Sequence, residues 1–118
     1  MPRPLQVVAE VPQFIRDVQA VGLSPAEHTS IVDMVAANPL GGDEVRGSGG
    51  VRKVRVAGRG KGKSGGYRIM TAYFGPDAPV YLIALLSKGE RGNFTAAEVA
   101  GFKAVTTDIA RYWRRRVR

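Results

Sequence analysis

The chain has 118 residues, 44% of them hydrophobic, with no cysteine and a single histidine. This length predicts one domain over residues 1–118, and the missing cysteines exclude disulfide frameworks and thiolate metal sites. The net charge of +8 is uneven: residues 1–45 carry two Lys or Arg against six Asp or Glu, and residues 46–118 carry sixteen against four. We therefore expect a basic face that binds nucleic acid, no bound metal or cofactor, and, because no apolar run could cross a bilayer, a cytoplasmic protein.

The N-terminal part predicts a short strand followed by two helices. The strand is expected over residues 5–9, and the first helix over residues 12–20, where Gly22 ends its apolar stripe. The second helix begins at S-P-A-E, residues 24–27, which combines an N-cap serine, a proline at the first helical position and a glutamate placed for a capping box. We expect this helix to end before Pro39.

Residues 49–74 predict a long and strongly basic β-hairpin. In its first strand, valines alternate with Lys53 and Arg55, which places apolar groups on one face and cations on the other. A glycine-rich loop then leads into a returning strand over residues 67–74. Seven cations lie in this hairpin without a carboxylate among them: Arg52, Lys53, Arg55, Arg59, Lys61, Lys63 and Arg68. Such a concentration of one sign is typical of a surface that binds a polyanion.

The C-terminal part predicts a buried strand and a long helix. Residues 80–86 are apolar throughout, as in a strand covered on both faces. T-A-A-E at residues 95–98 is a second capping box, and the helix that follows ends in a run of arginines that suits its dipole. The apolar stripe of this helix consists of Val99, Phe102, Val105, Ile109 and Trp113. We expect an α+β fold in which two N-terminal helices and a C-terminal helix pack on a small, mainly antiparallel sheet.

Three motifs follow one another in the basic half of the chain. They are G-S-G-G-V-R-K-V-R-V at residues 47–56, G-R-G-K-G-K-S-G-G-Y-R-I at residues 58–69, and L-L-S-K-G-E-R-G-N-F-T-A-A-E at residues 85–98. In order and spacing these motifs resemble the RelE/HigB toxins of bacterial type II toxin–antitoxin systems. The resemblance covers about residues 38–98. It implies a RelE-like fold, cleavage of mRNA on the ribosome, and a cognate antitoxin, often a helix-turn-helix protein in the HigB branch.

The resemblance also implies which residues act. The family's paired basic residues on the first hairpin strand match Lys53 and Arg55, and its arginine on the second strand matches Arg68. Its basic cluster after the last strand matches Lys88 and Arg91. The catalytic candidates are Lys53, Arg55, Arg68 and Lys88. The candidates for RNA binding are Arg52, Arg59, Lys61, Lys63 and Arg91.

The chemistry of these residues suits RNA cleavage without a metal. The 2′-hydroxyl attacks the adjacent phosphate, and Lys and Arg can stabilise the charge that builds on the phosphoryl and leaving oxygens. Arginine keeps its proton and serves as a clamp. Like charge from Arg55 and Arg68 disfavours the ammonium form of Lys53, which makes this lysine the candidate for proton transfer. Phe94 and Thr95 stand where some relatives carry a tyrosine, so the assignment of general acid and base stays open.

Two other functions use the same residues differently. A ParE-like toxin that binds DNA gyrase would have the same fold without needing Lys53 or Arg68. A plain RNA- or ribosome-binding module would use the cations only for the phosphate backbone. The hairpin lacks the stacked aromatics usual in single-strand RNA platforms, although Tyr67 and Tyr73 could either stack on bases or pack in the sheet.

Overall fold

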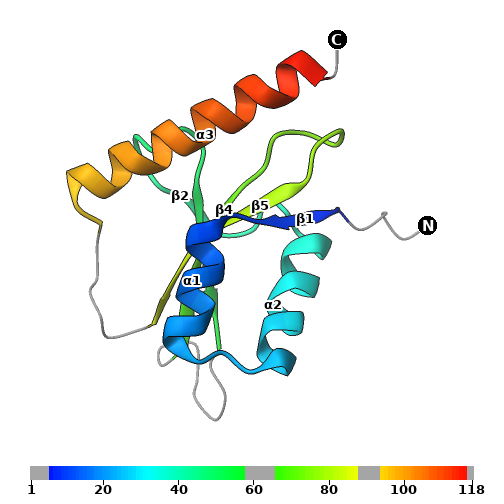
Figure 1. Ribbon diagram of the computed structural model, residues 1–118, viewed down its shortest axis with the longest axis vertical. Helices are drawn as coiled ribbons and strands as arrows, with labels where there is room; N and C mark the ends of the chain where they lie inside the picture. The colour runs from blue at the N-terminus through cyan, green and yellow to red at the C-terminus, as the bar shows by residue number, and fades with distance from the viewer. Residues whose placement is uncertain (1–5, 58–65, 88–93, 117–118) are drawn as a thin grey trace.

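The computed structural model describes residues 6–57, 66–87 and 94–116 (Figure 1). The elements are β1 (Val8–Glu10), α1 (Pro12–Val21), α2 (Pro25–Ala37), β2 (Asp43–Glu44), β3 (Arg52–Val56), β4 (Tyr67–Ala72), β5 (Val80–Ser87) and α3 (Ala96–Arg116). The predicted α+β class and order of elements are confirmed, and the short strand β2 is an addition to them. No helix in the described ranges is both long enough and apolar enough to span a membrane.

The strands form one sheet in the order β1-β5-β4-β3-β2. β1 runs parallel to β5, and all other neighbours are antiparallel, so the mainly antiparallel sheet and the β3–β4 hairpin are confirmed. β1 begins three residues later than the expected strand because its pairing starts where β5 starts, with Val8 opposite Val80. The basic hairpin therefore forms one side of the sheet, away from β1.

Each face of the sheet carries its own apolar cluster. On one face Phe14 of α1 and Ile31 of α2 pack with strand residues such as Ile69 and Leu82. The other cluster, which includes Met70 and Ala84, packs against partly buried residues of α3 and of the segment before it. β5 contributes to both clusters, which confirms that it is covered on both faces.

The two predicted capping boxes are present. Ser24 Oγ accepts a hydrogen bond from the backbone N–H of Glu27 at 3.1 Å, and the Glu27 carboxylate accepts one from the N–H of Ser24. Thr95 and Glu98 make the same reciprocal pair at the start of α3. Gly22 ends α1 with a φ of 77°, a left-handed conformation that suits glycine. The sequence signals at these helix ends were therefore sufficient to predict where the helices begin or end.

The predicted apolar stripe of α3 is wrong at one position. Val105 is 36% exposed, whereas its neighbour Thr106 is 2% exposed. The Thr106 hydroxyl donates to the carbonyl oxygen of Ser48 at 3.2 Å, which fixes the rotation of the helix about its axis. Phe102 and Ile109 still face the sheet, because they lie four and three residues from Thr106 on the same side.

Candidate nucleic-acid interface

Arg55 and Arg68 form a row of like charges across the β3–β4 hairpin. They lie directly opposite each other in the register, and Arg68 is in turn opposite Leu86 of β5. Directly opposite residues of an antiparallel pair share a face, with their Cβ atoms about 4.5–5.5 Å apart, and like charges in that position are destabilising. Two guanidinium groups placed in this way can bind one phosphate from both sides. A bound anion would interact favourably with both guanidinium groups.

Lys53 lies on the same face as this row, two residues before Arg55. The pleat of β3 places Val54 and Val56 on the opposite face, where they are paired with Ile69 and Tyr67. Arg55 is exposed, and Lys53 and Arg68 are partly exposed. The predicted separation of valines and cations is therefore confirmed, and three of the four catalytic candidates come together on one accessible face.

The arginine row, Arg55 and Arg68, lies in a part of the sheet that α3 does not cover. Val51 and Met70, further along the strands, belong to the cluster beside α3, whereas Arg55 and Arg68 lie toward the hairpin end of the same face. In Figure 1, α3 crosses the sheet near one end and the strands extend beyond it. The helix thus completes the core without covering the hairpin end of this face.

Asp43 is a neighbour of Lys53 that the sequence did not indicate. It lies directly opposite Lys53 in the β2–β3 pair, and both residues line a cavity of about 310 Å³ with Glu44 and Phe94. Only cations were expected around Lys53, because Asp43 is nine residues from the hairpin strand and a two-residue strand has no periodic signal. Lys53 therefore has Asp43 beside it on β2, Met70 opposite it on β4, and Arg55 two residues further along β3.

Arg52 is separated from the other hairpin cations. Its Nε donates to the carbonyl oxygen of Gly41 at 3.2 Å and its Nη2 donates to that of Gly42 at 2.7 Å, so the guanidinium holds the turn before β2. The alternation along β3 places Arg52 on the same face as Val54, opposite to the face of Lys53 and Arg55. This alternation in the sequence already distinguished Arg52 from the other hairpin cations. The contribution of Arg52 to RNA binding stays a prediction.

The remaining predicted site residues lie outside the described residues. These are the candidates in the hairpin loop and in the segment after β5: Arg59, Lys61, Lys63, Lys88 and Arg91. The hairpin loop joins Val56 of β3 to Tyr67 of β4, and the other segment follows Ser87 of β5. Only this order along the chain relates these candidates to Arg55 and Arg68. Within the described ranges, no group of three or more His, Cys, Asp or Glu side chains is arranged to hold a metal ion.

The two tyrosines of the hairpin pack in the sheet. Tyr67 and Tyr73 are partly buried against the cluster beside α1 and α2, on the face away from the arginine row. The Tyr67 hydroxyl donates to a carboxylate oxygen of Glu27 at 3.5 Å. Burial first, and then the charge and hydrogen bond of Glu27, raise the pKa of Tyr67 above 10.0. Tyr67 is thus part of the support for the hairpin and is not placed to stack on RNA at the arginine row.

This raised pKa predicts a pH dependence of stability. The unfolded chain releases the Tyr67 proton from about pH 10, whereas the folded protein holds it to higher pH, so ionisation favours unfolding. The contribution of the protonated Tyr67 to the free energy of unfolding should be fully present below pH 10. It should be lost as the pH rises through the pKa of Tyr67 in the folded protein. We expect Tyr67→Phe to reduce the loss of unfolding free energy between pH 9 and pH 11, measured by urea denaturation. Equal losses in both proteins would contradict this coupling.

Comparison with known families agrees with the arrangement of the sheet and hairpin. The chain matches the family model described as the RelE toxin of the RelE / RelB toxin-antitoxin system, and the match covers residues 24–117. The matched region begins at the N-cap of α2 and contains the basic hairpin, β5 and α3. The chain therefore belongs to the RelE toxin family, whose toxins have a cognate antitoxin as partner.

Proposed function

We propose that this toxin is a cytoplasmic endoribonuclease that cleaves mRNA on the ribosome and so inhibits translation. The observation that carries the proposal is the direct cross-strand pairing of Arg55 with Arg68 beside Lys53 on an accessible face. Two arginines on one accessible face are suited to binding a phosphate group. A scissile phosphate bound there would gain two charge-assisted contacts.

The proposed reaction is a transesterification within the RNA. The 2′-oxygen forms a bond to phosphorus, the bond from phosphorus to the 5′-oxygen breaks, and the products are a 2′,3′-cyclic phosphate and a 5′-hydroxyl. Arg55 and Arg68 stabilise the negative charge that increases on the phosphoryl oxygens in the transition state. The 2′-hydroxyl loses a proton and the leaving 5′-oxygen gains one, and Lys53, two residues before Arg55 on β3, transfers one of these protons. No protein-bound metal is required for these steps.

The partners in this proposal follow from the charge of the chain. The hairpin loop and the segment after β5, with Arg59, Lys61, Lys63, Lys88 and Arg91, supply further phosphate contacts to mRNA and the ribosome. The antitoxin is proposed to be a helix-turn-helix protein. An acidic segment of it would be captured quickly by a toxin with a net charge of +8.

Induced expression tests the function directly. Without the antitoxin, the unmutated toxin should stop growth, and sequencing of transcript 5′ ends should show new ends that fall within translated codons. Co-expression of the antitoxin should remove both effects. DNA damage after induction, without new mRNA 5′ ends, would instead support a toxin of DNA gyrase. Normal growth during strong expression of the toxin alone would rule out both.

A further inference from the structure

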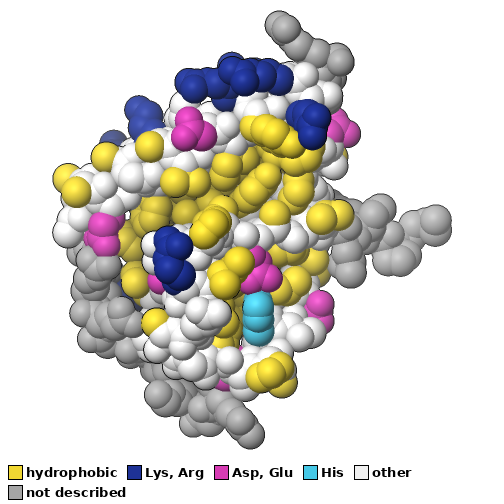
Figure 2. All heavy atoms as spheres, in the orientation of Figure 1, with side chains coloured by type: hydrophobic (Ala, Val, Ile, Leu, Met, Phe, Trp, Pro, Cys, Tyr) yellow, Lys and Arg dark blue, Asp and Glu magenta, His cyan; other side chains and the backbone are white. Residues whose placement is uncertain are grey.

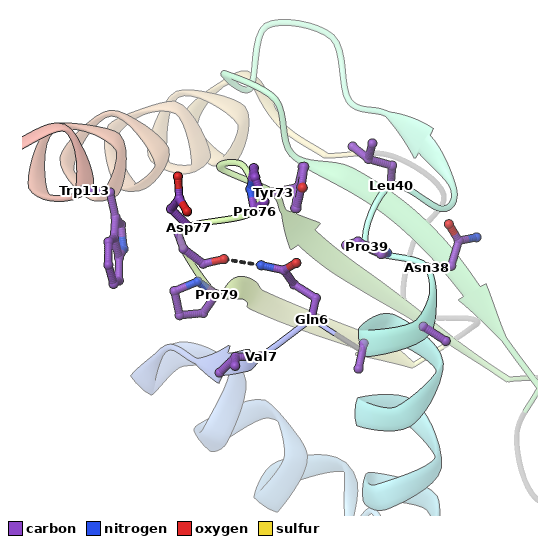
Figure 3. A pocket seen from close by; sticks show the side chains of 13 residues that line it. Gln6, Val7, Asn38, Pro39, Leu40, Tyr73, Pro76, Asp77, Pro79 and Trp113 are labelled. Atoms are coloured by element: carbon purple, nitrogen blue, oxygen red, sulfur yellow. Dashed lines mark hydrogen bonds between the residues drawn. The ribbon is translucent and has the colours of Figure 1, made fainter. Parts of the chain in front are cut away.

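An apolar cavity lies at the end of the molecule away from the arginine row. It has a volume of about 640 Å³ and is bounded by the end of α2, by the turn between β4 and β5, and by Trp113 of α3 (Figure 3). Tyr73, which lines it, follows the C-terminal end of β4, whereas Arg68 lies near the start of that strand. The two residues are five positions apart in the sequence, or about 17 Å along an extended strand.

Hydrogen bonds hold the walls of this cavity in place. The Gln6 side-chain amide donates to the carbonyl oxygen of Ala78, and the Gln6 backbone N–H donates to that of Ala36 at 3.0 Å. Trp113 Nε1 donates to the Tyr81 hydroxyl at 2.8 Å, which fixes the indole ring. Strand, turn and helix therefore meet in a preformed cavity, and a ligand would not have to order them.

The rim of the cavity exposes large apolar side chains. Val7 is 68% exposed and Leu40 is 56% exposed, more than any other large hydrophobic residue of the described ranges. Figure 3 shows these two side chains and Trp113 on three sides of the cavity. Exposed apolar groups around a hollow mark an interaction site more often than scattered single residues do. The cavity and its rim are suited to an apolar side chain from a partner.

Charge beside the cavity indicates which kind of partner fits. Trp113 and Asp77 also line a second hollow of about 310 Å³, which reaches Arg114 on α3. The last two turns of α3 carry Arg111, Arg114, Arg115 and Arg116. Asp108, which forms an ion pair with Arg111 at 3.8 Å, is the acid nearest to them in the sequence. Figure 2 shows Lys and Arg side chains along the outer side of α3 and hydrophobic side chains gathered below the helix.

We propose that this cavity is the docking point for the cognate antitoxin. An apolar side chain of the antitoxin would enter between Leu40 and Trp113, and acidic residues next to it would pair with the arginines at the end of α3. RNA would use the arginines but not the apolar cavity. A second copy of this chain, with a net charge of +8, would meet general repulsion. The inference rests on the family of the toxin for the identity of the partner, and does not require the proposed nuclease activity.

Binding of the purified antitoxin to the purified toxin, measured by biolayer interferometry, tests the proposal. Leu40→Glu places a carboxylate at the rim without disturbing a buried group, so the fold should be retained. If Leu40 borders an anchor pocket, the dissociation constant should rise about 30-fold or more, as for other interface hot spots. Arg114→Glu should also weaken binding. Ile15→Glu is the matched control, because Ile15 is a 45% exposed apolar residue of α1 outside the cavity.

Three outcomes would overturn the docking proposal. Leu40→Glu could bind like Ile15→Glu, within about threefold. Arg68→Ala could weaken antitoxin binding more than Leu40→Glu does, which would place the antitoxin on the hairpin. The unmutated toxin could be a dimer that Leu40→Glu dissociates in analytical ultracentrifugation, which would make the cavity a self-interface. A toxin that binds antitoxin through Leu40 but cuts no mRNA would refute the nuclease function alone.

Discussion

Replacing Arg68 by alanine is expected to lower the rate of mRNA cleavage on the ribosome about 10²- to 10³-fold, the usual loss when one preorganised charge stabiliser is removed. In the proposed site Arg68 lies between Arg55 on β3 and Leu86 on β5. No neighbouring strand residue on that side can take over its charge, because Leu86 is apolar. Single-turnover cleavage of mRNA on programmed ribosomes would measure the loss.

The control for this variant is an arginine on another surface. Arg16 of α1 is exposed, and Arg16→Ala removes the same charge away from the hairpin. It should cleave at the rate of the unmutated toxin. Both variants should still co-sediment with ribosomes, which separates loss of chemistry from loss of binding. Full cleavage by Arg68→Ala would refute the mechanism, as would a stoichiometric metal ion in the purified toxin.

Lys53→Arg separates charge from proton transfer in the same assay. Arginine keeps the positive charge next to Asp43 but does not give up its proton at ordinary pH. If Lys53 transfers a proton, this variant should cleave almost as slowly as Arg68→Ala. If Lys53 only binds phosphate, cleavage by Lys53→Arg should stay close to that of the unmutated toxin.

Local patterns in the sequence were enough to predict most of the elements. Both capping boxes and the left-handed Gly22 depend on residues within one turn of each other, so no tertiary information was needed. The alternation in β3 was equally local, and it placed Lys53 and Arg55 on one face. In these features the conformation that the local sequence favours is also the one that the folded protein adopts.

The exact register of the strands, and the pairing of β2 with β3, could not be predicted. That Arg55 lies opposite Arg68 depends on the register of the hairpin, and a glycine-rich connection of ten residues allows several registers. Asp43 reaches Lys53 only because β2 pairs with the outer edge of β3. The buried side of α3 includes Thr106, whose hydroxyl donates to the carbonyl oxygen of the distant Ser48, and the apolar stripe alone did not indicate this contact. Long-range contacts of this kind determine the site, although they leave no periodic trace in the sequence.

Salt should weaken the affinity of the toxin for ribosomes steeply. A protein that makes six to ten phosphate contacts loses about 10³- to 10⁵-fold in affinity between 50 and 200 mM salt, because counterions are released from the nucleic acid. We expect Arg59, Lys61 and Lys63 to account for part of this dependence, since their loop joins the strands that carry Arg55 and Arg68. Each contact to single-stranded RNA contributes about 0.7 to the slope of log affinity against log salt.

Replacing these three loop residues together by glutamine should therefore reduce the slope by about 2 and weaken binding most at low salt. The matched control replaces Arg111, Arg114 and Arg115 of α3 by glutamine, which lowers the net charge by the same amount without changing the hairpin. If the loop contacts phosphate, only the loop variant should show the flatter slope in filter binding at several salt concentrations. Equal flattening in both variants would mean that net charge, rather than the hairpin loop, determines how the toxin binds ribosomes.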